Sequence, residues 1–214
     1  MISKPNKSDK KRIKKSKTYK EIMVIAMRNV KAVYDKYTVG KKTPAMMQVC
    51  GPISTGGAGN VKDNLALFET AICTIKKIGY YVFNQIPYED AMGRIKKERE
   101  KEKKIQPKKA EKQDKKDKKH SKKSKIKIKK SQKVQRDTYD YTLLEEFYRP
   151  IMESGMIACV VFLPGWRSSI GARWEYKVAK KKKILRLELK KNWLQMIKDG
   201  ETNIHKLTTP ITRL

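Results

Sequence analysis

The segment Met156-Ile-Ala-Cys-Val-Val-Phe-Leu163 is apolar throughout, which is typical of a central strand in a parallel sheet that is covered on both faces. Shorter apolar runs of the same kind lie at residues 45–50, 80–84 and 184–189. Helical spacing of apolar residues is found at residues 18–37, 61–78, 139–154, 172–181 and 191–198, with Pro150 expected to kink or interrupt the third helix. This alternation predicts one α/β domain, a Rossmann-like (flavodoxin-like) parallel sheet of four to five strands flanked by helices.

Charge divides the chain into a domain and its appendages. The net charge of +31 comes from 53 Lys and Arg against 22 Asp and Glu, and most of the excess lies near the N-terminus and between Arg94 and Arg136. We expect residues 85–92 to form a loop, and Glu98, Glu100 and Glu102 to allow a short solvated helix after it. The composition predicts a disordered basic tail at 1–17, a domain made of 18–93 and 137–200, a disordered Lys-rich insertion at 94–136 and a polar C-terminal tail at 201–214.

Membrane, secreted and metal-binding classes are disfavoured. The longest apolar run is about half of the roughly 20 residues that a membrane helix needs, and the N-terminal region has no secretory apolar stretch, so we expect a cytoplasmic protein without a membrane partner. Cys50, Cys73 and Cys159 lack CxxC spacing and lie in apolar segments, which predicts small buried side chains rather than disulfides or zinc ligands. The two histidines, His120 and His205, offer no metal cluster or catalytic triad.

The lysine-rich segments are able to attract nucleic acid non-specifically through its phosphates. The central segment has no aromatic residue and few arginines, which single-strand recognition normally uses. A passenger insertion without a binding role is therefore an equally good interpretation. Because this segment follows the second predicted strand, it enters at the edge of the sheet where we expect a pocket, and its charge would attract anionic substrates there.

The loop Gly51-Pro-Ile-Ser-Thr-Gly-Gly-Ala-Gly-Asn60 joins the first predicted strand to a helix. Glycines at such a place let backbone N–H groups approach an anion, and the helix N-terminus adds positive potential. Gly51, Ser54, Gly56 and Gly57 are therefore candidates to bind a phosphate or a sugar, although the loop has neither the Walker pattern nor GxGxxG. A simple turn explains the glycines equally well.

A second loop, Gly165-Trp-Arg-Ser-Ser-Ile-Gly-Ala-Arg-Trp-Glu175, follows the 156–163 strand. The positive end of the helix dipole is expected to keep Glu175 ionised at neutral pH. A carboxylate beside a phosphate- or hydroxyl-binding loop is what a glycosyl-transferring nucleophile requires, because negative charge stabilises an oxocarbenium-like transition state. A cap, or an ion pair with Arg173 or Lys177, is the alternative role.

Together, Val49-Cys-Gly-Pro-Ile-Ser-Thr-Gly-Gly57 and Leu163-Pro-Gly-Trp-Arg-Ser-Ser-Ile-Gly-Ala-Arg-Trp-Glu-Tyr-Lys-Val-Ala179 resemble the nucleoside 2-deoxyribosyltransferase-like superfamily, more closely its small bacterial and phage branch with nucleoside 5′-monophosphate N-glycosidases. The resemblance covers about residues 46–93 and 138–190. It implies that Glu175 is the nucleophile of a covalent glycosyl intermediate, that Ser169 and Gly171 hold the 5′-phosphate or 5′-hydroxyl, and that no metal or organic cofactor takes part.

Some positions depart from the family or extend beyond its motif. The aspartate that the family usually carries on the helix before the third strand is absent, and Glu146 is the nearest acidic candidate for its catalytic role. Tyr88 and Asp90 are candidates to contact base or sugar from the loop after the second strand. Trp166 and Ser168 complete the candidate binding residues, although a tryptophan in such a loop packs as often as it stacks on a base.

The sequence therefore predicts an N-glycosidase or deoxyribosyltransferase that acts on a nucleoside or nucleoside monophosphate. Water as acceptor makes it a hydrolase and a second base makes it a transferase, and the residues do not choose between them. The alternative is a non-catalytic module that keeps the fold and binds nucleotide or nucleic acid. The resemblance also implies a homo-oligomer, with the 18–37 helix as a candidate contact.

Overall fold

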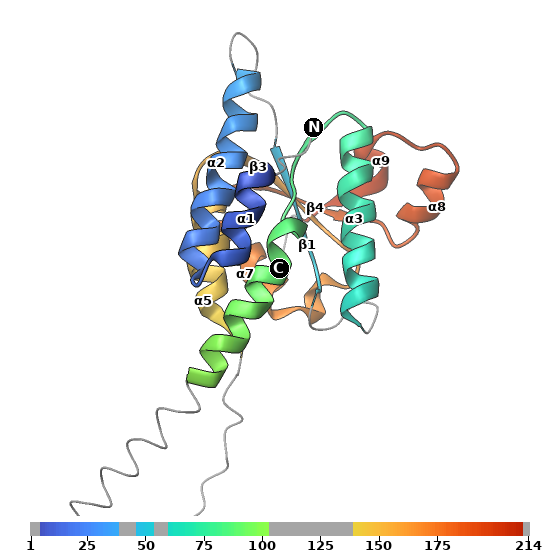
Figure 1. Cartoon of the computed structure of the whole chain (residues 1–214). Coiled ribbons are helices and arrows are strands. Elements are labelled where there is room, and N and C mark those ends of the chain that lie inside the picture. Colours follow the sequence, from blue (N-terminus) through green and yellow to red (C-terminus); the bar gives the residue numbers. More distant parts are fainter. Residues whose placement is uncertain (1–4, 39–45, 54–59, 103–138, 212–214) are drawn as a thin grey trace, which may run out of the picture.

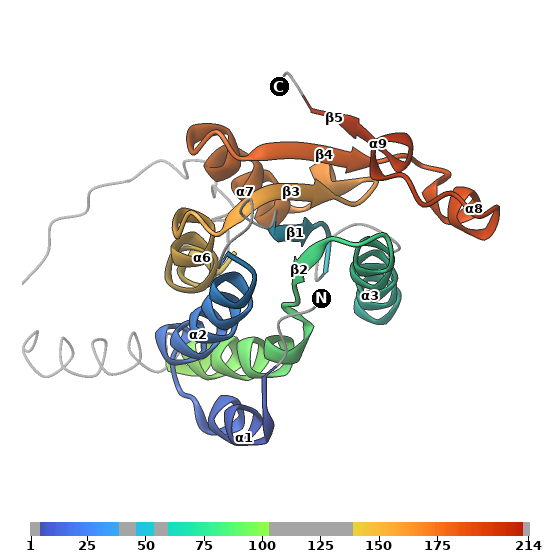
Figure 2. The same cartoon turned by 90° about the horizontal axis from the view of Figure 1, so that it is seen from above.

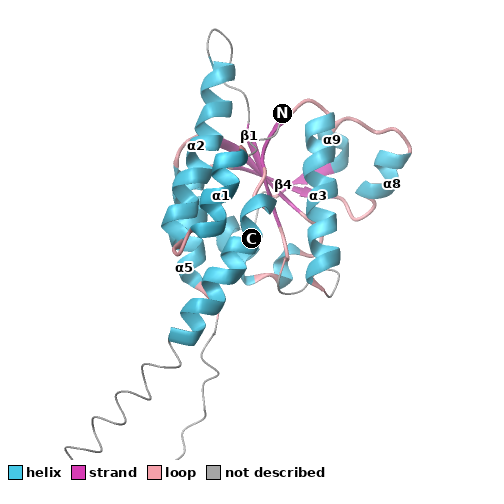
Figure 3. Ribbon diagram, in the orientation of Figure 1, coloured by secondary structure: helices cyan, strands magenta, loops and turns pink. Residues whose placement is uncertain are grey.

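The computed structural model describes residues 5–38, 46–53, 60–102 and 139–211 (Figure 1). They form one five-stranded sheet with helices on both faces (Figure 3). The strands are β1 (Met46–Cys50), β2 (Tyr81–Phe83), β3 (Ile157–Phe162), β4 (Leu185–Leu189) and β5 (Thr208–Pro210). The helices are α1 (Lys7–Lys15), α2 (Tyr19–Thr38), α3 (Val61–Lys77), α5 (Tyr141–Leu143), α6 (Arg149–Glu153), α7 (Ile170–Lys181), α8 (Trp193–Lys198) and α9 (Ile204–Leu207).

The strands run in the order β2-β1-β3-β4-β5. All neighbours pair in parallel except β4 and β5, which are antiparallel. A mostly parallel α/β sheet of four predicted strands is thus confirmed, and its order is the flavodoxin-like one. The chain continues from β1 to β2 on one side and from β3 to β4 on the other side. The loop after β1 therefore leads to α3 on one face of the sheet, the loop after β3 leads to α7 on the other face, and a crevice lies between the two loops.

Helices cover both faces of the sheet (Figure 2). On one face α2, α6 and α7 pack in a cluster with alternate strand residues such as Val160. On the other face α3, α8 and α9 pack in a second cluster with the intervening residues such as Val161. This two-sided burial explains why the β3 segment is apolar at consecutive positions. None of the helices in the described part is both long and apolar enough to cross a membrane.

The helix before β3 is continuous but changes its winding. A π segment, η2 (Leu144–Tyr148), lies between α5 and α6, and the Arg149 N–H donates to the Leu144 carbonyl five residues back. The predicted interruption at Pro150 is wrong, because the helix runs through this residue to Glu153. Pro150 lies in the first turn of α6, directly after the π segment, where its missing N–H is tolerated. π segments of one turn often lie at functional sites.

The predicted tail at 1–17 is wrong for residues 7–15, which form α1. Asn6 and Asp9 form a capping box at its start, and Asp9 also pairs with Arg28 of α2. Ile13 is 4% exposed and joins the core. Ile13 and the buried Asp9 carboxylate both contact other segments of the chain. Composition alone does not reveal such contacts.

The predicted loop at 85–92 and the start of the insertion at residue 94 are also wrong. Residues Ile86–Tyr88 form a 3-10 turn (η1), and residues 89–102 form one helix, hereafter the 89–102 helix. Ile95 is fully buried in the core, so the domain extends at least to residue 102. The short helix expected near Glu98 is confirmed as the end of this longer one, and residues 103–136 of the predicted insertion lie outside the described residues.

The C-terminal region is likewise more ordered than predicted. Within the predicted polar tail, α9 leads into β5, which adds an antiparallel edge to β4. The Thr-Thr-Pro sequence of β5 lacks an apolar run, and a proline is tolerated at such an edge. Of the cysteines, Cys50 and Cys159 are buried as expected, whereas Cys73 is exposed on the outer side of α3, contrary to the prediction.

Candidate active site

A cavity of about 260 Å³ lies beside the carboxyl ends of β1 and β3, where the strand order reverses. In open α/β sheets this crevice is the usual ligand site. Its wall comes from the end of β1, the start of α3, the segment from Gln85 through the 89–102 helix, the region from Tyr139 to η2, and the start of α7. The lining includes Gly51, Glu89, Lys96, Tyr139, Tyr148, Ser169, Gly171 and Glu175.

Glu175 is the most deeply placed acid of this cavity. It lies on α7, is 5% exposed, and accepts a hydrogen bond of 2.9 Å from Nε2 of Gln48. Burial raises the pKa of Glu175 to about 8, and hydrogen bonds from Cys50 and Gln48 offset only part of that effect. The prediction of an ionised Glu175 at neutral pH is therefore wrong. The residue lies beyond the first turn of α7, where the dipole effect has fallen off, and desolvation outweighs it.

Gln48 was missed by the sequence analysis. It is fully buried in β1, and its Nε2 donates a hydrogen bond to Glu175. The same Nε2 donates to Sγ of Cys50 at a distance of 3.7 Å. Its Oε1 has no hydrogen-bond partner in the described part of the chain. A polar side chain in the middle of an otherwise apolar strand was the available signal, because buried polar groups are costly unless they bond to something.

Glu89 is the second acid of the cavity, and it was also missed. It is partly buried at the start of the 89–102 helix, and the Tyr148 hydroxyl donates to its Oε1 at 3.4 Å. Burial raises the pKa of Glu89 to about 7. Glu89, Met92 and Lys96 all line the cavity and are spaced as on one face of a helix. This spacing could have identified Glu89, but residues 85–92 were predicted to form a loop.

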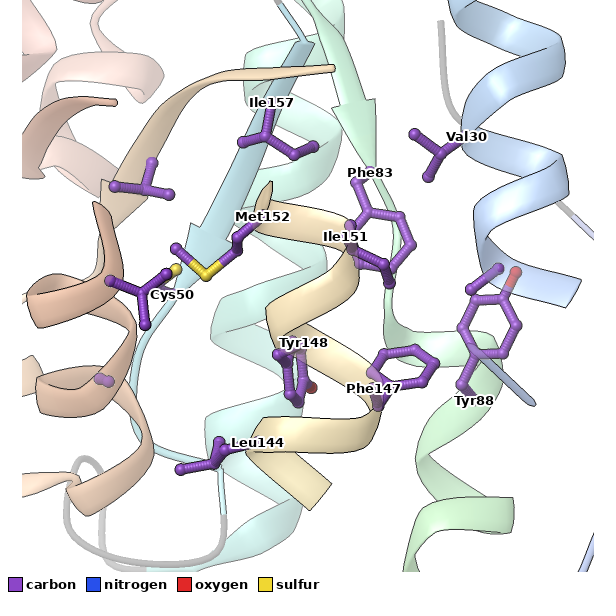
Figure 4. Close-up of a cluster of buried hydrophobic side chains, with 14 of the residues drawn as sticks. Val30, Cys50, Phe83, Tyr88, Leu144, Phe147, Tyr148, Ile151, Met152 and Ile157 are labelled. Atoms are coloured by element: carbon purple, nitrogen blue, oxygen red, sulfur yellow. The ribbon is translucent and has the colours of Figure 1, made fainter. Parts of the chain in front are cut away.

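The two candidates beside Glu89 differ in their placement. Asp90 lines the cavity and is exposed. Tyr88, in contrast, is fully buried, with its ring centroid 5.6 Å from that of Phe147 and 6.4 Å from that of Phe83 (Figure 4). Tyr88 thus belongs to the core, and its predicted contact with substrate is wrong. An aromatic residue after a strand does not reveal from sequence which way its ring points.

Ser169 and Gly171 lie at the cavity as predicted. Ser169 caps α7, its Oγ accepting a hydrogen bond of 3.3 Å from the Ala172 N–H. A Cβ on Gly171 would lie 2.6 Å from the hydroxyl of Tyr139, so only glycine leaves room for that hydroxyl at the cavity wall. Gly51 also lines the cavity, and a Cβ there would meet the Leu163 side chain at 3.0 Å.

Other predicted residues do not reach this cavity. Trp166 is fully buried and stacks on Tyr176 with ring centroids 5.2 Å apart, so its predicted binding role is wrong. Ser168 is exposed and donates to the Gly165 carbonyl at 2.8 Å, outside the cavity lining. Glu146 is also absent from the lining and lies 3.8 Å from the Lys20 ammonium.

The remaining candidates, Ser54, Gly56 and Gly57, lie outside the described residues. Within the parts of the chain that the structure describes, no three His, Cys, Asp or Glu side chains are grouped so as to hold a metal ion. No protein-family model matches this chain, and neither a curated protein nor a solved structure matches it significantly.

Proposed function

We propose that this protein cleaves the N-glycosidic bond of a nucleoside or nucleoside 5′-monophosphate through a covalent glycosyl intermediate on Glu175. The observation that carries the proposal is the placement of this carboxyl. Glu175 is buried in the wall of a cavity at the carboxyl ends of β1 and β3, held by Gln48, with the α7 cap residue Ser169 in the same wall.

The chemistry follows from that placement. The ionised Glu175 carboxylate attacks the anomeric carbon while the bond to the base breaks, and its charge stabilises the oxocarbenium-like transition state. The hydrogen bond from Gln48 fixes Oε1 of this carboxyl. The raised pKa of Glu175 limits the ionised fraction near neutral pH, and the same low-dielectric surroundings strengthen the attraction between carboxylate and developing cation.

The test is release of free base from a panel of nucleosides and nucleoside 5′-monophosphates, followed by chromatography. A second base added in excess distinguishes transfer from hydrolysis. We expect base release from at least one member of the panel. Tight nucleotide binding without release from any member would instead support the non-catalytic module.

Lys96 provides a test of whether the substrate carries a phosphate. Lys96 belongs to the 89–102 helix, is partly buried and lines the cavity. Its ammonium group adds a positive charge to a wall whose other charged residues are acids. We expect Lys96→Gln to raise KM for a monophosphate roughly tenfold, and to leave KM for the matching nucleoside nearly unchanged, because a charge-assisted contact to phosphate is lost. Lys97→Gln, at the exposed neighbouring position, is the control. Equal losses on both substrates would contradict a phosphate contact.

Gly171 provides a second test of the cavity wall. In Gly171→Ala the new methyl group collides with the Tyr139 hydroxyl, and overpacking of this kind costs about 1–3 kcal/mol. We expect KM to rise roughly tenfold or more as the phenol shifts. Adding Tyr139→Phe removes the colliding oxygen, so the double variant should recover much of the loss. A double variant as impaired as Gly171→Ala would show that the collision is not the cause.

A further inference from the structure

One face of the 89–102 helix forms a wall of the cavity. Glu89, Met92 and Lys96 follow one another at intervals of three and four residues, and all three line it. This helix therefore places an acid, Glu89, at one end of its cavity face and a cation, Lys96, about two turns further along. The motif that carries Glu175 supplies neither of them.

The carboxyl of Glu89 is held from a second element. The Tyr148 hydroxyl, on the π segment η2, lies 3.4 Å from Oε1 of Glu89 and 3.9 Å from Sδ of Met92. Tyr148 is 6% exposed, and its ring packs edge-on against Phe147 at 5.0 Å between centroids. The donor is thus fixed by packing, and the Glu89 side chain is directed along the wall rather than into solvent.

Glu89 and Glu175 line the same cavity. The charge of Glu89 contributes to the raised pKa of Glu175, after the larger effect of burial. Both carboxyls line one small cavity, and burial favours the protonated form of each. Pairs of this kind divide into an acid and a nucleophile in glycosidic-bond cleavage.

We propose, on the basis of the function proposed above, that Glu89 is a second catalytic residue, the group that protonates the departing base and then activates the water. In the first step a Glu175 oxygen bonds to the anomeric carbon, the carbon–nitrogen bond breaks with its electron pair passing to the base, and the Glu89 proton moves to the base. The base leaves neutral, and Glu89 remains as a carboxylate.

The second step restores both groups. The Glu89 carboxylate takes a proton from water, whose oxygen bonds to the anomeric carbon while the ester to Glu175 breaks and its electron pair returns to Glu175. The sugar leaves with a hydroxyl at that carbon, Glu89 is again protonated and Glu175 is again ionised. One residue thus acts as acid and then as base.

The reactive protonation state sets the pH profile. The titratable and charged side chains at the cavity around Glu89 are Tyr148, Tyr139, Asp140, Glu175, Asp90 and Lys96. The state that reacts has the proton on Glu89 and the charge on Glu175. Because the pKa of Glu175, about 8, lies above that of Glu89, about 7, this state is the minor of the two singly protonated forms, and its population is greatest between the two ionisations. We expect kcat/KM to be bell-shaped, with limbs near pH 7 and pH 8.

The decisive experiment compares leaving groups in Glu89→Gln. For the best natural substrate we expect kcat/KM to fall by roughly 10²–10⁴-fold, the usual contribution of a general acid. For a 4-nitrophenyl glycoside of the same sugar, whose leaving group departs without a proton, formation of the intermediate should change by less than about threefold. The bell-shaped profile should become a single rise with pH, since only Glu175 ionisation then matters.

Controls separate this role from a structural one. Glu98→Gln makes the same change on the same helix at an exposed position paired with Arg94, and it should behave as wild type. Thermal unfolding of each variant shows whether Glu89→Gln still folds, and its activity on the nitrophenyl substrate reports an intact site directly. Equal losses of Glu89→Gln on both substrates, or an unchanged natural turnover, would overturn the role of Glu89. Absence of base release by wild type would instead refute the underlying function.

Discussion

Glu175→Gln is expected to lower base release at least about a thousandfold, with substrate binding weakened far less. The amide is nearly isosteric with the protonated carboxyl and still accepts the hydrogen bond from Gln48, so the cavity keeps its shape. An amide has no negative charge to offer the anomeric carbon and forms no ester. Loss of a nucleophile removes covalent catalysis entirely, which is why the effect exceeds those expected at Lys96 or Gly171.

Steady-state base release and nucleotide affinity, measured on the same preparation, check this prediction. Glu153→Gln is a suitable control because that carboxylate pairs with Lys182 at the surface, 3.4 Å away. If Glu175→Gln retained a tenth or more of the activity, Glu175 would not be the nucleophile. A loss of affinity as large as the loss of turnover would indicate a collapsed cavity instead.

The same substitution is expected to stabilise the fold at alkaline pH. Burial raises the pKa of Glu175 to about 8 from its ordinary 4.5, so between these values the folded chain keeps a proton that the unfolded chain has lost. The associated stability is fully present below about pH 4.5 and is lost as the pH rises to about 8. Glu175→Gln has no such dependence, and at pH 8.5 we expect it to be more stable than wild type by on the order of 4 kcal/mol.

Urea unfolding of wild type and Glu175→Gln at pH 5 and pH 8.5 measures this difference. Taking the difference between the two proteins removes the contribution of every other titrating group. We expect a small gap at pH 5 that widens at pH 8.5. A gap that stays constant would mean that Glu175 is already ionised at neutral pH, as the helix dipole alone suggested, and that its site is better hydrated than the 5% exposure indicates.

Much of the fold was predictable because the four parallel strands are apolar runs between helical patterns. What was missed depends on contacts between distant segments. The α1 helix is anchored by Ile13 and by the pairing of Asp9 with Arg28, and the 89–102 helix by Ile95 in an otherwise charged stretch. Ile13 is the single buried apolar residue of α1, and Ile95 is the single one of the 89–102 helix beyond Met92, so the charged residues dominate the local composition, which then indicates disorder.

The site was predictable where local geometry decides it. The strand–loop–helix pattern placed Ser169, Gly171 and Glu175 at one edge of the sheet, and the structure brings them to one cavity. The protonation of Glu175 was not predictable, because it depends on how many atoms of other segments surround the carboxyl. The partnership with Gln48 arises only when β1 and α7 pack together. Binding of nucleic acid by the lysine-rich segments and a homo-oligomeric state stay predictions.

The most direct test of the account is to trap the intermediate. A 2-deoxy-2-fluoro analogue of the cleaved nucleotide slows both steps, because fluorine destabilises the oxocarbenium-like transition state, and the second step is expected to become limiting. Intact-mass spectrometry should then show the protein heavier by one fluoroglycosyl group, and peptide mapping should place that group on Glu175. Turnover of the substrate without any adduct, or an adduct on Glu89 instead, would contradict the assignment of Glu175 as the nucleophile.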